Sequence, residues 1–253
     1  MTSHVEPQLD AILSFHSIDD SGGILSYPER ELAQLLNLLV DDGVAIVPLA
    51  RLLETAPDGR RRVALTFDDG IRTVRTAALP LLKARALPFT LFVVSDFVGR
   101  DNGWPSQPTG IARMALLDWS ELAELRDAGA EIGGHSATHV ELRGLSPAEW
   151  TRELADSRKR LEDRLGVTVT SFAYPYGSHD DEAVRRVGSQ FERAVTTRLD
   201  YVHRGEEAFR LPRLDSHYLQ PAARWRRLFG WRARTTIELR AFARSLRGGG
   251  GRS

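Results

Sequence analysis

Apolar runs and amphipathic stretches alternate along residues 11–197 of the chain. Runs rich in apolar and β-branched residues predict strands, which fall at 11–16, 44–49, 62–67, 89–94, 131–134, 170–174 and 193–197. The stretches between them with helical spacing of apolar residues predict helices, which fall at 29–43, 74–86, 118–129 and 146–166. Repeated units of strand then helix predict an α/β protein with a parallel sheet, either open or closed into a barrel.

Two of the predicted helices have recognisable ends. Asp118 is followed three residues later by Glu121, and Ser146 by Glu149, which is the spacing of a capping box. Gly166 follows the last apolar position of the second helix and predicts its end.

No linker or internal repeat divides the chain, and we predict a single domain over residues 1–220. Residues 221–253 form a basic extension in which Trp225, Phe229 and Trp231 are interleaved with arginine, and its glycine-rich end is expected to be disordered. Such a stretch is either a solvated helix or a contact with an anionic membrane surface. The N-terminal residues lack a signal-peptide pattern, so we expect a cytoplasmic protein, peripheral to the inner membrane if the extension binds lipid.

The amino-acid composition limits which partners and which metal ligands the protein can have. The chain has 34 Lys and Arg against 34 Asp and Glu, and this formal net charge of zero gives no reason to expect a nucleic-acid partner. It has no cysteine, which excludes disulfides and thiolate-ligated zinc. Any metal site must therefore use His, Asp and Glu.

Two adjacent carboxylates, Asp68 and Asp69, follow the predicted strand 62–67. Like charges at the end of a buried strand are unfavourable unless something uses them. His135 and His139 follow a later strand, and their spacing of four places both imidazoles on one side of a helical turn. One carboxylate and two histidines make a three-ligand metal site with open positions, while the other carboxylate is free to act as a base.

Three motifs in this order, TFDDG, HSATH and FAYPYG, resemble those of the polysaccharide deacetylase family (NodB homology domain, carbohydrate esterase family 4). The resemblance covers residues 10–220. It implies a distorted (β/α)7-type barrel that removes N-acetyl groups from an N-acetylhexosamine-containing glycan or glycolipid precursor. It also implies that Asp69, His135 and His139 hold one divalent metal ion and that Asp68 is the base acting on the metal-bound water. Zinc is expected first, with cobalt, manganese, iron and nickel as alternatives.

The sequence departs from the common pattern of that family at the general acid and at one arginine. Ala173 stands where the usual third motif, RxPY, has its arginine, and the last motif with its histidine has no clear match. The FAYPYG form is similar to the exopolysaccharide-type branch, in which the acid comes from the N-terminal strand. We therefore expect His16 to be the general acid, with His217 as its rival, and Arg213 to replace the missing arginine by orienting the base.

The resemblance also implies a substrate groove. Tyr176 is expected to line it beside Pro175 and to offer its backbone N–H to the developing oxyanion. Trp104 lies in a long loop; an exposed tryptophan there would stack on a sugar ring, and a buried one would only pack. His217 is a further candidate for contact with the carbohydrate.

Two other functions fit the same residues. A hydrolase of another amide, such as a formamide or a small cyclic amide, would use the same metal site and would have a closed pocket in place of an open groove. A catalytically silent glycan-binding protein would keep the groove, but it would need no base beside a metal.

Overall fold

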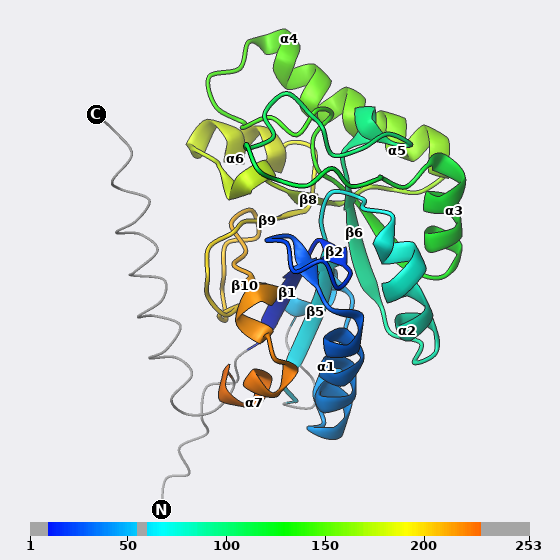
Figure 1. Ribbon diagram of the computed structural model, residues 1–253. Coiled ribbons are helices and arrows are strands. Elements are labelled where there is room, and N and C mark those ends of the chain that lie inside the picture. The colour runs from blue at the N-terminus through cyan, green and yellow to red at the C-terminus, as the bar shows by residue number, and fades with distance from the viewer. Residues whose placement is uncertain (1–9, 55–59, 229–253) are drawn as a thin grey trace, which may run out of the picture.

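An 8-stranded sheet, parallel throughout the described part of the chain, curls through the centre of the molecule (Figure 1). The structure is a computed structural model, and it describes residues 10–54 and 60–228. The strand order is β10-β1-β5-β6-β7-β8-β9, with β4 beside β5. The strands are β1 (Ala11–Phe15), β4 (Ala45–Ile46), β5 (Arg62–Phe67), β6 (Phe89–Val93), β7 (Ala130–Gly134), β8 (Ser171–Ala173), β9 (Arg193–Val195) and β10 (Leu214–Asp215). A separate small sheet pairs β2 (Ser17–Ile18) with β3 (Ser26–Tyr27).

The curl brings the two ends of the sheet together. Leu211 forms a parallel bridge with Val195 of β9, and β10 pairs with β1. The segment 211–215 therefore joins the last strand of the sheet to the first. The prediction of a single α/β domain with a distorted barrel is confirmed.

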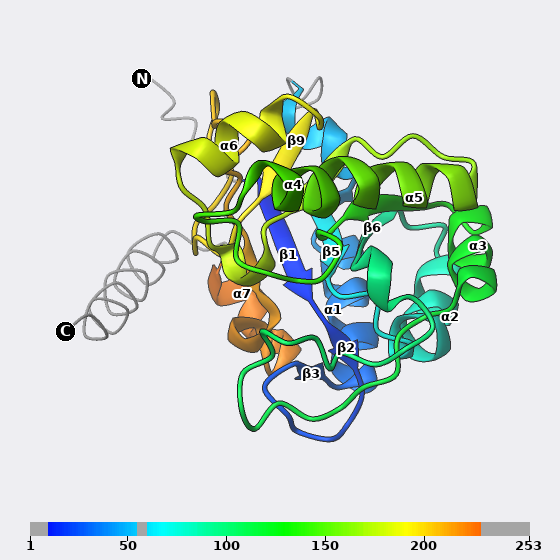
Figure 2. The same cartoon turned by 90° about the horizontal axis from the view of Figure 1, so that it is seen from above.

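Helices surround the sheet in both views (Figures 1 and 2). They are α1 (Glu29–Asp41), α2 (Leu79–Lys83), α3 (Trp119–Asp127), α4 (Pro147–Trp150), α5 (Ser157–Leu165), α6 (Asp181–Gly188) and α7 (Trp225–Leu228). A π-helical turn, Val74–Ala78, leads into α2, and another, Thr151–Asp156, joins α4 to α5. The predicted helices at 74–86 and 146–166 are thus present, each with a π-helical turn inside it.

Both predicted capping boxes are present. The side chain of Asp118 accepts a hydrogen bond from the backbone N–H of Glu121, and the carboxylate of Glu121 accepts one from the backbone N–H of Asp118. Ser146 and Glu149 make the same reciprocal pair at the start of α4. Gly166 ends α5 with a φ of 64°, a left-handed conformation that glycine adopts at little cost.

The strands are buried on both faces, as expected for a parallel sheet covered by helices. Leu13 and Leu65 point outward into the main core between the sheet and the helices. Ile12 and Ala64, their neighbours, point inward to a smaller cluster that includes Phe92. This inner cluster fills the middle of the curled sheet.

The beginning of the predicted extension 221–253 packs on the domain. Ala222 and Trp225 belong to the main core, and the backbone N–H of Ala222 donates to the buried carboxylate of Glu31 at 2.6 Å. Trp225 is 1% exposed, so it is a core residue and cannot reach a membrane surface from this position. Phe229 and Trp231 lie outside the described residues, and both the membrane contact and the cytoplasmic location stay predictions. No helix in the described ranges has the length and apolar character to cross a bilayer.

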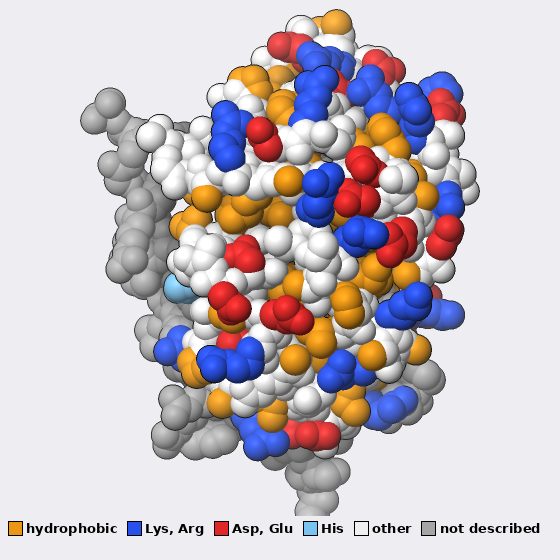
Figure 3. All heavy atoms as spheres, turned by 45° about the vertical axis from the view of Figure 1, so that its right-hand side comes forward, with side chains coloured by type: hydrophobic (Ala, Val, Ile, Leu, Met, Phe, Trp, Pro, Cys, Tyr) orange, Lys and Arg blue, Asp and Glu red, His pale blue; other side chains and the backbone are white. Residues whose placement is uncertain are grey.

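Charges of both signs are mixed on the face that carries α3 and α5 (Figure 3). Several of them form ion pairs, such as Lys159 with Asp163 at 2.6 Å and Arg152 with Asp96 at 2.9 Å. Exposed pairs of this kind contribute little to stability.

Candidate active site and metal centre

The carboxyl ends of the strands bring the predicted site residues together. His16 follows β1, Asp68 and Asp69 follow β5, and His135 follows β7. Arg213 precedes β10, the strand that pairs with β1. Parallel strands present their carboxyl ends on one side of the sheet, which is where α/β proteins carry their sites.

Asp69, His135 and His139 form a buried cluster of possible metal ligands. Oδ1 of Asp69 lies 3.4 Å from Nε2 of His135 and 3.3 Å from Nε2 of His139. The two Nε2 atoms lie 3.2 Å apart. Ligand atoms about 2.0–2.1 Å from a tetrahedral zinc ion are about 3.3 Å from one another. The three donor atoms therefore have the mutual spacing that such an ion requires.

The polar atoms of this cluster are arranged for a cation. Oδ1 of Asp69 is buried and accepts no hydrogen bond within the described part of the chain. Nδ1 of His135 lies 2.7 Å from the carbonyl oxygen of Ala173, so this nitrogen carries the proton and Nε2 presents its lone pair to Asp69. An unsatisfied buried carboxylate oxygen beside a lone pair is unfavourable unless a positive ion lies between them.

The pKa values of the cluster reflect burial and its neighbours. Burial raises the pKa of Asp69, but the imidazoles of His135 and His139 lower it more, and it lies well below its ordinary value. Burial lowers the pKa of His135, yet the two aspartates raise it above the ordinary value. Burial dominates at His139 and its pKa is lowered. An ionised Asp69 and a neutral His139 are the forms that bind a metal.

The HSATH segment is irregular, and the prediction of a helical turn there is wrong. Ser136 and His139 have φ values of 62° and 59°, both in the left-handed region. These two positions bend the chain so that both imidazoles face the carboxylate of Asp69. Asp69 itself and Tyr176 also have positive φ, so four of the five non-glycine residues with this conformation in the described ranges belong to the site. Such strain is concentrated at functional sites in proteins.

Glu153 fixes the HSATH segment through hydrogen bonds to its backbone and to one side chain. Its carboxylate accepts hydrogen bonds from the backbone N–H groups of Ala137 and Thr138, both at 2.9 Å, and from Oγ1 of Thr138 at 2.8 Å. The residue is 3% exposed and lies in the turn Thr151–Asp156. The sequence analysis missed it, although an acid at a core-facing position of a predicted helix was a signal.

Arg213 holds Asp68 with a fork of two hydrogen bonds. Nη1 donates to Oδ1 and Nη2 to Oδ2, each at 2.7 Å, while Nε donates to the carbonyl oxygen of Thr196 at 2.9 Å. Burial raises the pKa of Asp68, but the Arg213 guanidinium lowers it more, so that the carboxyl is ionised. This geometry agrees with the expectation that Arg213 orients Asp68, and its part in catalysis stays a prediction.

The two candidate acids differ in position. Nε2 of His16 lies 3.8 Å from Oδ2 of Asp68, and the His16 side chain is 28% exposed, so that it borders both the buried Asp68 carboxylate and solvent. His217 is exposed in the turn Ser216–Leu219, where its backbone N–H donates to Asp215. The geometry favours His16 over His217.

Tyr176 covers His139, one of the candidate metal ligands. Their rings meet edge to face with centroids 4.5 Å apart, and residue Tyr176 is 36% exposed to solvent. Its hydroxyl donates to the carbonyl oxygen of Ser106 at 2.8 Å, and Oγ of Ser106 donates to the carbonyl oxygen of His139 at 2.7 Å. Ser106, which the sequence analysis did not single out, therefore connects the long loop to the site.

Trp104 and Pro175 are buried. Of the two alternatives for Trp104, the buried position is the one present, and contact of Pro175 with substrate stays a prediction. Trp104 is 2% exposed because its ring stacks on His139 at 4.2 Å and meets the ring of Phe97 at 5.7 Å. It packs behind His139 and offers no open face to a sugar ring.

Comparison with known proteins shows which family and which fold this chain resembles. The family described as polysaccharide deacetylase matches residues 55–192. The chain is 27% identical to YxkH of Bacillus subtilis over 208 residues, which cover 80% of this chain and 70% of that protein. It is 29% identical over 129 residues to the peptidoglycan-N-acetylglucosamine deacetylase PgdA of Listeria monocytogenes, covering 51% of this chain and 24% of that protein. The chain thus spans about a quarter of the length of PgdA.

Among solved structures, the chain is similar to IcaB from Ammonifex degensii. The TM-score is 0.72 at 24% sequence identity, over 86% of this chain and 97% of that one. A likeness at this level of identity shows the same fold.

Proposed function

Since this chain belongs to the polysaccharide deacetylase family, we propose that it is a metal-dependent hydrolase of N-acetyl groups on an N-acetylhexosamine-containing glycan or glycolipid precursor. One observation carries the proposal: the buried donor atoms of Asp69, His135 and His139 converge beside an ionised Asp68. The name of the relative PgdA, a peptidoglycan-N-acetylglucosamine deacetylase, supports the class of substrate.

Asp69, His135 and His139 would hold the ion, with zinc expected first for two histidines and one aspartate. When bound, a divalent ion supplies positive charge that polarises the amide carbonyl and acidifies water.

Asp68 takes the proton from the attacking water. It is suited to this because the Arg213 guanidinium keeps it ionised and fixes its orientation. A carboxylate has about four lone-pair positions, so the two hydrogen bonds from Arg213 leave room for that proton. The backbone N–H of Tyr176 donates a hydrogen bond to the carbonyl oxygen of the acetyl group as negative charge develops on it.

His16 protonates the departing amine. An amine leaves poorly without a proton, and general acid catalysis of this kind contributes about 10²–10⁴-fold in rate. His16 suits the role because its imidazole lies beside Asp68. It is also partly exposed to solvent, so a substrate that arrives from solvent can contact it.

Acetate release from a panel of N-acetylated sugars tests this function. The panel runs from monosaccharide to oligomer to lipid-linked precursor, with zinc, cobalt or manganese added and Asp68→Asn as the inactive control. Release by the wild type alone supports a deacetylase and ranks its substrates. No release on any substrate, with metal shown to be bound, would contradict the proposal and favour hydrolysis of other amides, then a silent glycan-binding protein.

A further inference from the structure

Two of the residues that follow β9, Thr196 and Arg198, contact Arg213. The carbonyl oxygen of Thr196 accepts a hydrogen bond from Nε of Arg213, and that of Arg198 accepts one from its backbone N–H, both at 2.9 Å. The first contact orients the guanidinium and the second fixes the main chain beneath it. The position of the segment 196–198 therefore decides where the Arg213 fork lies relative to Asp68.

The regular strand ladder stops before this segment, although the backbone N–H of Thr196 still donates to the carbonyl oxygen of Leu211 at 2.9 Å. β9 ends at Val195, and the chain from Thr196 to Asp200 is irregular. Thr196 is fixed by its own contacts: Oγ1 donates to the carbonyl oxygen of Leu211 at 3.1 Å and accepts from the backbone N–H of Arg198 at 3.1 Å. Beyond Thr196, side-chain bonds add to the backbone hydrogen bond that the N–H of Arg213 donates to the carbonyl oxygen of Arg198.

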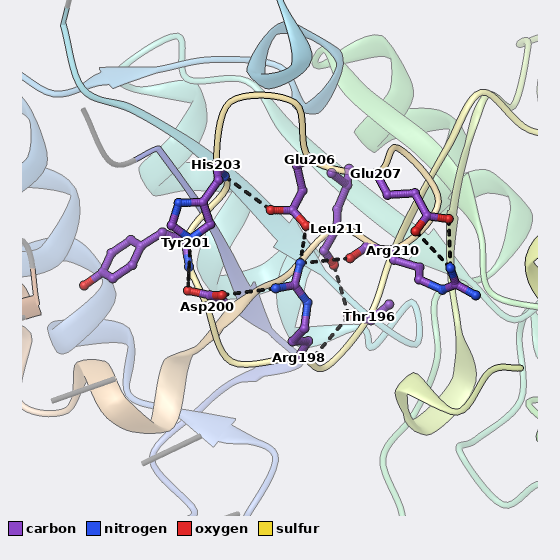
Figure 4. Close-up of polar contacts among 9 residues, drawn as sticks. All are labelled: Thr196, Arg198, Asp200, Tyr201, His203, Glu206, Glu207, Arg210 and Leu211. Carbon is purple, nitrogen blue, oxygen red and sulfur yellow. Dashed lines mark hydrogen bonds and ion pairs between the residues drawn. The ribbon is translucent and has the colours of Figure 1, made fainter. Parts of the chain in front are cut away.

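Arg198 makes those bonds (Figure 4). Its Nη1 donates to Asp200 at 3.1 Å, while its Nη2 pairs with Glu206 and donates to the carbonyl oxygen of Arg210 at 3.4 Å. One guanidinium thus connects three separate points of the loop between β9 and Leu211.

The partners of Arg198 are held in turn. Oδ1 of Asp200 accepts from the backbone N–H of Tyr201 at 2.8 Å, and the carboxylate of Glu206 accepts from the backbone N–H of His203 at 3.4 Å (Figure 4). The carboxylates are therefore fixed acceptors with defined places in the loop, and the guanidinium that joins them has one position to occupy.

We infer that Arg198 is a positioning residue for the reaction proposed above, and this inference rests on that function. It holds the segment 196–198 in the place from which the two carbonyl oxygens direct Arg213 onto Asp68. Arg198 touches neither the metal ligands nor the base in the described contacts, and it acts through Arg213. A merely structural surface ion pair would contribute a little stability and leave the reaction unchanged.

The chain offers a matched control in Arg186. Its side chain is 41% exposed and pairs with Glu182 on α6 at 2.9 Å, whereas that of Arg198 is 44% exposed. Both variants, Arg198→Gln and Arg186→Gln, remove one exposed guanidinium and its ion pairing with acidic side chains, and only the first should loosen the 196–198 segment.

Steady-state kinetics of acetate release on the full chain loaded with metal give the first readout. Arg198→Gln should lower kcat about tenfold or more with little change in KM, because a small misplacement of a catalytic group is enough to slow the reaction. Arg186→Gln should match the wild type. In an Arg213→Lys background, adding Arg198→Gln should cause no further loss of kcat, because Arg198 acts only through the Arg213 fork and lysine cannot form that fork. An unchanged kcat in Arg198→Gln, or an equal fold loss in both backgrounds, would overturn the inference.

A second readout needs no substrate and separates this inference from the proposed function. The Nε–H of Arg213, identified in a ¹H–¹⁵N spectrum by its absence from Arg213→Lys, should exchange slowly in the wild type because it donates to a buried carbonyl. Arg198→Gln should speed that exchange about tenfold, and Arg186→Gln should not. If the wild type releases no acetate, the proposed function fails while this exchange still decides the inference, and equal exchange in all three proteins would overturn it.

Discussion

Arg213 and Asp68 are joined by two parallel N–H···O hydrogen bonds of 2.7 Å, with the side chains 2% and 4% exposed. A charge pair at this depth is favourable only when both partners are present, because either one alone would be a buried charge without compensation. The pair also decides which form of Asp68 exists, since the guanidinium outweighs burial and lowers the pKa of the carboxyl.

Variants of Arg213 should separate the effect of its positive charge on Asp68 from the effect of its two-hydrogen-bond fork. Arg213→Lys keeps a cation but cannot form the fork, so we expect kcat to fall about 10²-fold with the metal still bound. Arg213→Ala should in addition lower the free energy of unfolding by about 3–5 kcal/mol. Urea unfolding and acetate release measure the two effects. Full activity in Arg213→Lys would show that the fork has no part in orienting the base.

Glu153 should control metal affinity without touching the metal. Glu153→Gln weakens the three hydrogen bonds that fix Ala137 and Thr138, and loss of such a supporting contact raises the Kd for a metal about 10–100-fold. Titration calorimetry with zinc measures this. Glu149→Gln is the matched control, because glutamine also serves at that position of a capping box and Glu149 is exposed. Equal zinc affinity in the two variants would rule out this role of Glu153.

The two candidate acids are separated by paired variants. His16→Gln should reduce kcat by about 10²-fold or more, because its imidazole is beside Asp68. His217→Gln should change kcat little, since that side chain is exposed in a turn. The comparison is made on a single substrate at saturating metal. The reverse order of effects would assign the acid to His217.

Gly177 should be irreplaceable for a reason that Gly166 does not share. Both have positive φ, 69° and 64°, so alanine at either position is strained by about 1 kcal/mol. A Cβ on Gly177 would lie 2.0 Å from Oγ1 of Thr197, whereas one on Gly166 would meet nothing within 4 Å. We expect Gly177→Ala to lower both stability and kcat, because Thr197 and the adjacent Tyr176 must shift, and Gly166→Ala to lower stability alone. Comparable kcat values for the two would argue against a close fit at this point.

Local signals in the sequence were sufficient for much of the fold. Strand-like runs and capping boxes at Asp118 and Ser146 predicted the elements, because these depend on residues within one turn of each other. Parallel strands then placed Asp68, Asp69 and His135 on one side of the sheet without further information.

What the sequence did not reveal depends on contacts between distant segments. The bend at Ser136 and His139 is a choice of left-handed backbone that no periodic pattern encodes. The role of Glu153 and the burial of Trp104 follow from how the helical turn Thr151–Asp156 and the loop that carries Trp104 pack on the HSATH segment. The fork of Arg213 on Asp68 exists because the sheet curls until β10 lies beside β1, a relationship that spans 145 positions of sequence.

The proposed reaction requires one divalent ion at Asp69, His135 and His139. Its most direct test is to strip the protein with a chelator and measure acetate release after each addition of zinc, alongside Asp69→Ala. We predict that activity is absent at the start, rises in proportion to zinc, and reaches a plateau near one ion per chain, with no recovery in the variant. Full activity in the stripped protein, or equal recovery in Asp69→Ala, would contradict the account.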